Sequence, residues 1–207
     1  MLPFKTPFIA PYMYPGLLWK VKTVEKVLYL TFDDGPIPGL TEWVLEVLKH
    51  YEAKATFFCV GENVNKNPQI FQQILKEGHS VGNHTQHHLN GKKTSLEEYL
   101  ADALACDEAM KHESASTRLF RPPYGRLTNA QRKQLLQQKT IVMWDVLTQD
   151  YDQTLAPDLI LKKSIAATGK GAIVVFHDNL KAERNLREVL PQYLSHFKQA
   201  GYRFENL

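Results

Sequence analysis

Residues 27–36 read VLYLTFDDGP, an apolar run that ends in two adjacent carboxylates, Asp33 and Asp34, and a Gly-Pro pair. Because the run is apolar and rich in β-formers, we expect a buried strand that the Gly-Pro pair ends. A buried carboxylate without a partner is costly. Neighbouring side chains on an extended backbone point opposite ways, so one acid could hold a cation while the other accepts a proton. An ordinary turn is also commonly built from Asp-Asp-Gly-Pro, so both interpretations stay open at this point.

The composition is that of an ordinary globular domain. The 207 residues are 43% hydrophobic and 23% charged, which suits one large α/β domain. With 25 basic and 22 acidic residues the formal net charge is +3, which is too small to indicate a nucleic-acid partner. No apolar stretch approaches the length of a membrane span. We therefore expect neither a nucleic-acid partner nor a membrane segment, and the oligomeric state stays open.

The cysteines and the N-terminus bear on the cell compartment. Cys59 falls in a predicted strand and Cys106 in a predicted helix, and two such thiols make neither a disulfide framework nor a zinc–thiolate site. Residues 1–20 are rich in Pro and aromatics and lack the basic and apolar regions of a secretory leader. We therefore expect a cytoplasmic protein, with association with the cell envelope as the alternative.

Strands and helices alternate along the chain. We expect an extended arm over residues 1–26 that packs on a domain covering 27–207. In this domain, apolar runs predict strands at 27–32, 55–60, 79–82, 119–120, 141–146, 172–176 and 202–204. Amphipathic patterns predict helices at 40–50, 67–77, 94–112, 129–138, 157–167 and 183–199. A capping box of Thr94 and Glu97 should open the third of these helices. About seven alternations favour a parallel sheet with helical crossovers.

Polar residues gather where the predicted strands end. They are Asp33, Asp34, the cluster that begins at His84, Arg121, Asp150 and His177. In a closed β/α barrel the C-terminal ends of the strands meet at one mouth, where active sites form. An open doubly wound sheet would place a ligand in a single crevice instead. We favour the barrel because it brings all of these residues into one site.

The histidines could bind a metal. His84 and His88 are four residues apart and would share one side of a helical turn, while His84 and His87 are an alternative pair. A single pair is a weak signal, because histidine is also a surface residue. Asp34 completes a set of two imidazoles and one carboxylate, which suits a catalytic Zn²⁺ and which Co²⁺ or Ni²⁺ could also occupy. Asp33 would then accept the proton of a metal-activated water.

Three motifs in order carry a resemblance to a known family. Residues 31–36 (TFDDGP) and the pattern His84-Thr85-x-x-His88 look like the first two motifs of the polysaccharide deacetylases, the NodB-homology enzymes of carbohydrate esterase family 4. Residues 121–125 (RPPYG) are similar to the third motif. The resemblance runs from about Val27 to the C-terminus. It implies a distorted (β/α)7 barrel with its active site at the C-terminal ends of the strands.

The resemblance implies a role for each matching residue around the metal. Asp33 would be the general base, and the metal ligands would be Asp34, His84 and His88. Arg121 would hold the Asp33 carboxylate, for which the guanidinium fork is well suited. The backbone N–H of Tyr124 would help to stabilise the oxyanion, and Pro123 beside it would contribute to the substrate site.

The resemblance also implies a general acid. His177, in Val175-Phe176-His177, would protonate the leaving amine, and Asp150 would orient His177 and keep it cationic. Asp145 is a competing partner for His177, but Asp150 matches the motif position. The sequence departs from the family pattern at Tyr151, where Trp is usual, at Leu147, where Asp is frequent, and at Val175, where Leu is usual. In the family the first and last of these positions line the pocket for the acetyl methyl group, so Tyr151 and Val175 should change its shape.

The function implied is metal-dependent removal of N-acetyl groups from an amino-sugar glycan such as peptidoglycan or chitin-like oligomers. The expected partner is thus an acetylated saccharide. O-deacetylation of a polysaccharide such as xylan uses the same groups and is the nearest alternative. Hydrolysis of a non-glycan amide and a catalytically inactive, glycan-binding relative are the others.

Overall fold

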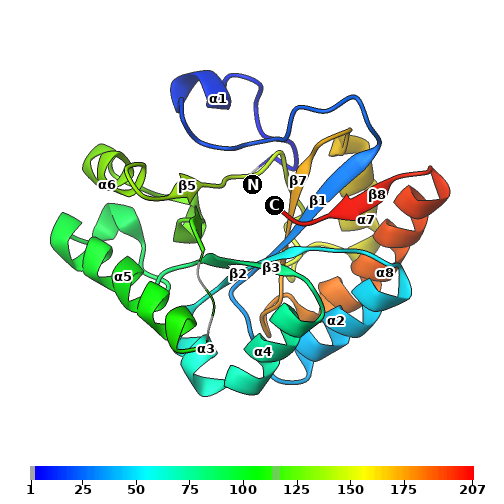
Figure 1. The fold of residues 1–207 in the computed structure, drawn as a ribbon. Helices are drawn as coiled ribbons and strands as arrows, with labels where there is room; N and C mark the ends of the chain where they lie inside the picture. The colour runs from blue at the N-terminus through cyan, green and yellow to red at the C-terminus, as the bar shows by residue number, and fades with distance from the viewer. Residues whose placement is uncertain (1–2, 114, 116) are drawn as a thin grey trace.

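The sheet is built from parallel strands that curl into an incomplete barrel (Figure 1). The structure is a computed structural model that describes residues 3–113, 115 and 117–207. Across these residues the strand order is β5-β4-β3-β2-β1-β7-β6, with β8 paired to β1 beside this path. The strands are β1 (Val27–Asp33), β2 (Thr56–Cys59), β3 (Ser80–Asn83), β4 (Leu119–Phe120), β5 (Thr140–Ile141), β6 (Val146–Leu147), β7 (Ile173–His177) and β8 (Arg203–Glu205). The prediction of a distorted (β/α)7 barrel is confirmed.

Strand β1 is the centre of the sheet. Its first half pairs with β8 and its second half with β2 on one side, while β7 pairs along the other side. The register sets Asp33 opposite His177 of β7 and opposite Phe58 of β2. Leu28, Leu30 and Phe32 are fully buried in the main core, which explains why this run forms a central strand.

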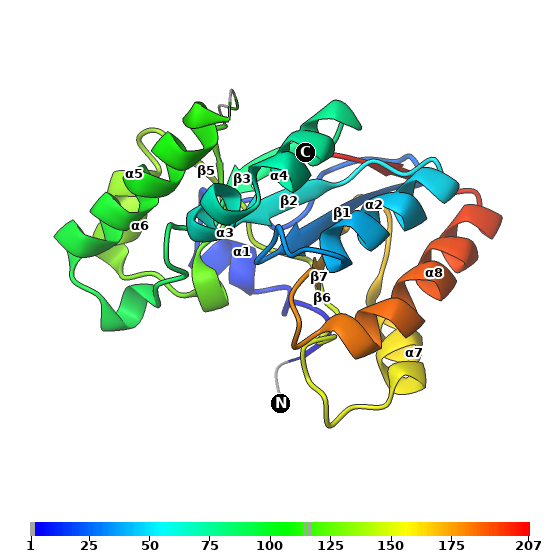
Figure 2. The same ribbon diagram turned by 90° about the horizontal axis from the view of Figure 1, so that it is seen from below.

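Helices cover the outer face of the curled sheet (Figure 2). They are α2 (Leu40–His50), α3 (Gly61–Lys66), α4 (Pro68–Lys76), α5 (Leu96–His112), α6 (Asn129–Leu135), α7 (Pro157–Ala167) and α8 (Glu183–Gln199). Two 3₁₀ turns, η1 (Gly91–Lys93) and η2 (Pro123–Gly125), lie in the loops that follow β3 and β4. The described helices include none that is long and apolar enough to cross a membrane.

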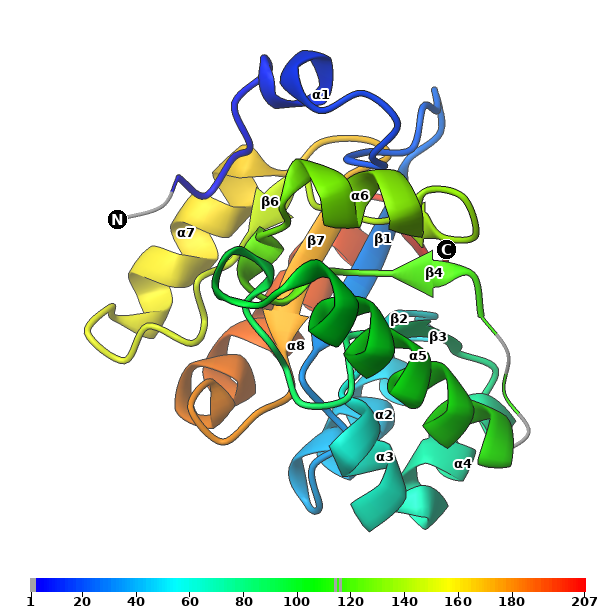
Figure 3. The same ribbon diagram turned by 90° about the vertical axis from the view of Figure 1, so that its left-hand side faces the viewer.

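The N-terminal segment, which contains the short helix α1 (Ala10–Met13), bonds to the open side of the barrel (Figure 3). Thr6 N–H donates to the carbonyl of Asp145, and Leu147 N–H donates to the carbonyl of Phe4. Leu18 N–H donates to the carbonyl of Ile141. This segment therefore covers the chain between β5 and β6, where the sheet has no continuous ladder.

Three local predictions differ from the structure. The predicted strand 141–146 is two short strands, because the N–H of Met143 donates to Leu18 of the N-terminal segment instead of to a neighbouring strand. Helix α5 is capped by Ser95, whose Oγ accepts from the N–H of Glu98, and not by a Thr94–Glu97 box. Helix α3 (Gly61–Lys66) lies between the predicted strand 55–60 and the predicted helix 67–77, in a stretch for which no element was predicted.

Candidate active site

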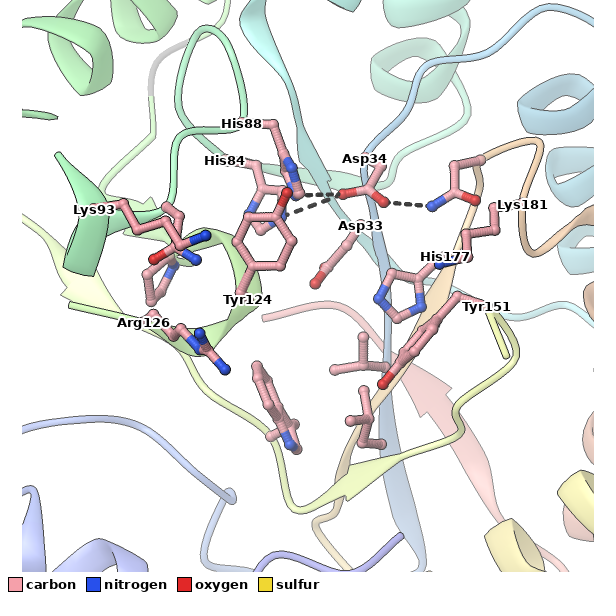
Figure 4. Close-up of a pocket in the computed structure, with 17 residues that line it drawn as sticks. Asp33, Asp34, His84, His88, Lys93, Tyr124, Arg126, Tyr151, His177 and Lys181 are labelled. Carbon is pink, nitrogen blue, oxygen red and sulfur yellow. Dashed lines mark hydrogen bonds and ion pairs between the residues drawn. The ribbon is translucent and has the colours of Figure 1, made fainter. Parts of the chain in front are cut away.

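A cavity of about 780 Å³ opens where the C-terminal ends of the strands meet (Figure 4). Residues that follow β1, β3 and β4 line it together with the end of β7. The lining residues are Asp33, Asp34, His84, His88, Asn90, Lys93, Pro122, Tyr124, Gly125, Arg126, Trp144, Leu147, Tyr151, Val175, His177, Asn179 and Lys181. Predicted site residues from positions 33 to 177 thus face one cavity.

Asp34 leaves the strand sharply, so that it can face the histidines. Its φ is 87°, in the left-handed region that non-glycine residues rarely adopt. Two contacts hold this conformation: Asn63 Nδ2 donates to the carbonyl of Asp34 at 2.8 Å, and Gly35 N–H donates to Asp178 Oδ1 at 3.1 Å. The two adjacent acids therefore diverge through a left-handed turn, rather than through the alternation of an extended strand.

Asp34, His84 and His88 form a site that fits a metal ion. Each offers a ligand atom, and these atoms lie within 4.8 Å of one another. Asp34 Oδ1 is 3.4 Å from His84 Nε2 and 3.1 Å from His88 Nε2. This oxygen is buried, and no described residue donates to it with hydrogen-bond geometry. Because a buried anionic oxygen without a donor is costly, these contacts suit a bound cation.

The tautomer of His84 supports the same interpretation. His84 Nδ1 is 2.7 Å from the main-chain carbonyl of Arg121, so Nδ1 donates this hydrogen bond and Nε2 is the nitrogen left for a metal ion. His84 Nε2 faces Asp34 Oδ1 at 3.4 Å, and a cation bound by both atoms would satisfy them. Burial would raise the pKa of Asp34, but the His84 and His88 imidazoles and the charge of His177 hold it well below its usual range. Asp34 is therefore anionic, as a ligand must be.

The histidines lie in a loop and not on a helical turn, which corrects the conformation predicted from their spacing. Thr85 and His88 have φ values of 63° and 55°. Asn83 Oδ1 accepts from the N–H of Thr85, and Thr85 Oγ1 accepts from the N–H of Leu89. His87, the alternative ligand, turns away, and its Nδ1 lies 2.6 Å from Asp102 Oδ1.

Arg121 is fully buried and holds Asp33. Its Nη1 donates to Asp33 Oδ1 at 2.6 Å and to Thr31 Oγ1 at 2.7 Å. Nε and Nη2 donate to the carbonyls of Val142 and Met143, and the guanidinium lies 4.1 Å from the ring centroid of Phe58. Burial lowers the pKa of Arg121, while the Asp33 charge opposes that shift. Asp33 is fixed in orientation and still faces the cavity.

His177 and Asp150 form a second charged pair across the cavity. His177 Nδ1 is 2.8 Å from Asp150 Oδ1, and the His177 N–H donates to Asp150 Oδ2 at 2.8 Å. Burial opposes protonation, but the Asp150 charge and hydrogen bond raise the pKa of His177 to about 9. Asp145, the competing partner, binds Lys5 Nζ at 2.7 Å instead. His177 can therefore hold a proton at neutral pH.

Apolar and aromatic groups complete the cavity. The Tyr151 ring packs edge-on against His177 with 4.9 Å between centroids, and Leu147, Val175 and Trp144 also line the cavity. Tyr124 stands over His88 with 4.7 Å between ring centroids, and 60% of its surface is exposed. Pro122 lines the cavity, whereas Pro123, which was predicted to contribute to the substrate site, is buried in the turn and is not among the lining residues.

Two polar neighbours of the metal site were missed by the sequence analysis. Asn179 Nδ2 donates to Asp34 Oδ2, the carboxylate oxygen that faces away from the histidines. Asp178 is fully buried and accepts from Gly35 N–H and from Thr41 Oγ1, at 2.6 Å for the latter. Burial raises the pKa of Asp178 to about 8, although these hydrogen bonds oppose the shift. The run His177-Asp178-Asn179 after an apolar strand was the signal that could have indicated them.

Comparison with known proteins gives consistent matches. The family model described as polysaccharide deacetylase matches residues 20–143. A peptidoglycan-N-acetylglucosamine deacetylase of Bacillus cereus is 34% identical over 189 residues, which are 90% of this chain and 88% of that protein. The deacetylase of that name from Listeria monocytogenes is 35% identical over 188 residues, but the match spans only 38% of its length.

A solved structure extends the match to the whole fold. The crystal structure of a peptidoglycan N-acetylglucosamine deacetylase, in complex with a substituted benzamide, superposes with a TM-score of 0.89 at 31% identity. The superposition covers 98% of this chain and 95% of that chain. The likeness therefore includes the N-terminal segment as well as the strands.

Proposed function

Because this chain belongs to the polysaccharide deacetylase family, we propose that it is a metal-dependent hydrolase that removes N-acetyl groups from amino-sugar residues of a glycan such as peptidoglycan. The resemblance carried by its motifs is confirmed, and its relatives are deacetylases of glycans. The observation that carries the proposal is the arrangement of one cavity: Asp33 held by Arg121, His177 held by Asp150, and the Asp34, His84 and His88 trio.

Asp34, His84 and His88 would hold the cation. When bound, a divalent metal supplies Lewis acidity, which lowers the pKa of a water molecule and polarises a carbonyl oxygen. Two imidazoles and one carboxylate suit Zn²⁺, and Co²⁺ or Ni²⁺ fit the same donors. Asn179 fixes the carboxylate of Asp34, and the Arg121 carbonyl fixes the ring of His84, so the donors are oriented before the cation arrives.

Asp33 acts as the general base. Its carboxylate faces the cavity beside Asp34, and Arg121 keeps it in one orientation. It accepts the proton of the attacking water as the oxygen bonds to the acetyl carbonyl carbon. The turn at Tyr124 supplies a main-chain N–H to the oxyanion that forms on the former carbonyl oxygen.

His177 acts as the general acid. An amine is a poor leaving group, so C–N cleavage requires a proton on the nitrogen. Asp150 keeps His177 protonated until about pH 9, and His177 transfers this proton as the bond breaks. Such an acid is most valuable for an amide, which favours N-acetyl over O-acetyl groups. Tyr151, Leu147 and Val175 line the part of the cavity suited to the acetyl methyl group.

Acetate release tests the proposal. We would assay N-acetylated oligosaccharides and an acetylated xylan with metal-free protein, after addition of Zn²⁺, Co²⁺ or Ni²⁺, and with Asp33→Asn. Activity on the N-acetyl substrates that requires metal and is lost in Asp33→Asn supports it, with the exposed Asp158→Asn as the matched control. Activity that survives both chelation and Asp33→Asn would overturn the mechanism, and release from xylan alone would identify an O-deacetylase.

A further inference from the structure

The rim of the cavity is cationic. Its lining contains Lys93, Arg126 and Lys181, while the acids among the described lining residues are Asp33 and Asp34. Arg121 neutralises Asp33, and Asp34 belongs to the metal trio. Within residues 3–113, 115 and 117–207, none of the three rim cations makes a salt bridge with an acid. With a divalent cation bound, the mouth is strongly positive.

Two of these cations stand together on one side. Figure 4 shows Lys93 and Arg126 on the side of His84, His88 and Tyr124, with Lys181 across the cavity near Tyr151. Lys181 lies 5.8 Å from the centroid of the Tyr151 ring. It also lies near Asp152, whose pKa is lowered mainly by hydrogen bonds from Thr154 and further by the Lys181 charge. Lys181 thus interacts with a nearby carboxylate, which leaves Lys93 and Arg126 as the two rim cations available to an anionic ligand.

The main chain beneath Lys93 and Arg126 is fixed. The two residues belong to different loops, which Gln131, buried at the start of α6, ties together: its Nε2 donates to the carbonyls of Gly91 and Thr94. The loops touch at Gly91, where an added Cβ would lie only 2.4 Å from the Arg126 carbonyl oxygen. The backbone at Lys93 and the backbone at Arg126 are therefore held in fixed relative positions, although both side chains are exposed.

We propose that Lys93 and Arg126 bind a carboxylate on the sugar next to the acetylated one, so that the preferred substrate is an anionic glycan. The inference rests on the proposed function, because it assumes that an acetylated sugar lies at the metal trio. A guanidinium binds a carboxylate through two parallel hydrogen bonds, and a lysine adds a point charge from the adjacent loop. A neutral glycan would gain neither contact.

The test compares matched substrates in matched variants. The substrates are an alternating oligomer of N-acetylglucosamine and N-acetylmuramic acid with a free lactyl carboxylate, its methyl ester, and neutral tetra-N-acetylchitotetraose. The variants are Lys93→Gln, Arg126→Gln and the double change. Lys92→Gln, which is exposed and does not line the cavity, is the control.

We expect KM for the free acid to be lower than for the ester by about tenfold, since exposed charge-assisted pairs contribute modestly and two act here. The double variant should remove this difference by raising KM for the acid to the value for the ester, and added salt should raise KM for the acid only. The Lys92→Gln protein should keep the full difference. An equal acid-to-ester ratio in the wild type and the double variant would overturn the inference while leaving deacetylation intact.

If no saccharide released acetate, the proposed function would fail. The carboxylate site could then still be tested by measuring the binding of the free acid and of its ester. Calorimetry of the metal-loaded Asp33→Asn protein with the free acid and with the ester measures this directly. Preference for the acid that is lost in the double variant supports the carboxylate site. Equal binding of acid and ester overturns it.

Discussion

The ring of His84 and the main chain of Arg121 are joined by a hydrogen bond, with 2.7 Å between Nδ1 and the carbonyl oxygen. The side chain of the same arginine binds Asp33 at 2.6 Å. One residue therefore orients the proposed metal ligand His84 through its backbone and the proposed general base Asp33 through its guanidinium. A displacement of residue 121 would disturb the ligand and the base together, so the two groups keep their relative positions.

The assignment of His84 and His88 as metal ligands can be tested with the adjacent His87 as the control. His84→Ala and His88→Ala each remove an imidazole nitrogen from the trio and should lower Zn²⁺ affinity about 100-fold or more. His87→Ala should leave the affinity unchanged, because His87 turns toward Asp102. Competition with a chromogenic chelator gives the dissociation constants. Loss of affinity in His87→Ala comparable to that in His88→Ala would mean that the ligands are wrongly assigned.

Asn179→Ala should weaken metal binding without abolishing it. Asn179 contacts the Asp34 oxygen that faces away from the histidines, so its loss frees the carboxylate to rotate. We expect an affinity loss of about tenfold, as is usual for a residue that orients a ligand. The control is Asn129→Ala, an exposed asparagine on α6. The measurement is a metal titration of both variants. Equal dissociation constants for Asn179→Ala and Asn129→Ala would refute this role for Asn179.

Arg121→Met should strongly destabilise the metal-free protein. The substitution leaves Asp33 buried without its cation, and breaking a buried pair on one side costs about 3–5 kcal/mol. Urea unfolding measures the loss, and Arg184→Met, at an exposed position of α8, should change it little. Adding Asp33→Asn to Arg121→Met should restore part of the stability, because it removes the orphaned charge. Additive losses in the double variant would contradict this coupling.

The Asp150–His177 pair predicts a pH dependence. The folded pKa of His177, about 9, lies above its ordinary value of 6.5, so the pair stabilises the protein fully below 6.5 and loses this contribution as the pH rises through 9. Activity should fall on the same alkaline side, because the general acid loses its proton. In Asp150→Asn, burial of His177 remains but the anion is gone, so the alkaline limb of kcat/KM should move to lower pH.

The measurement is a pH–rate profile of the wild type, Asp150→Asn and the exposed control Asp158→Asn. Only Asp150→Asn should shift the limb. An unshifted limb in that variant would show that His177 does not control it.

Much of the fold follows from local sequence. The run 27–32 is mostly apolar and forms most of the central strand, and the alternation of strands with helices was sufficient to predict a parallel sheet with helical crossovers. Residues 141–146 do not form one continuous strand, because two residues distant in sequence bond to their backbone. The carbonyl of Leu18 accepts from the N–H of Met143, and the Arg121 guanidinium donates to the carbonyls of Val142 and Met143. Such tertiary bonds leave no periodicity in the sequence.

The site was less accessible to sequence reasoning than the fold. The spacing of His84 and His88 indicated a shared metal, but their loop conformation depends on side-chain bonds from Asn83 and Thr85 that spacing does not encode. Both Pro122 and Pro123 are buried, and only Pro122 lines the cavity, a difference that depends on the turn and not on residue type. Asn179 has no motif of its own and is recognised only by its contact with Asp34.

The N-terminal segment has a consequence for handling the protein. By bonding to Ile141, Met143, Asp145 and Leu147, it occupies backbone groups that would otherwise be free strand edges. A free edge of this kind is a template for a neighbouring molecule, which leads to edge-to-edge aggregation. Nicking by a protease near residue 20 would thus threaten solubility before it altered any group in the cavity.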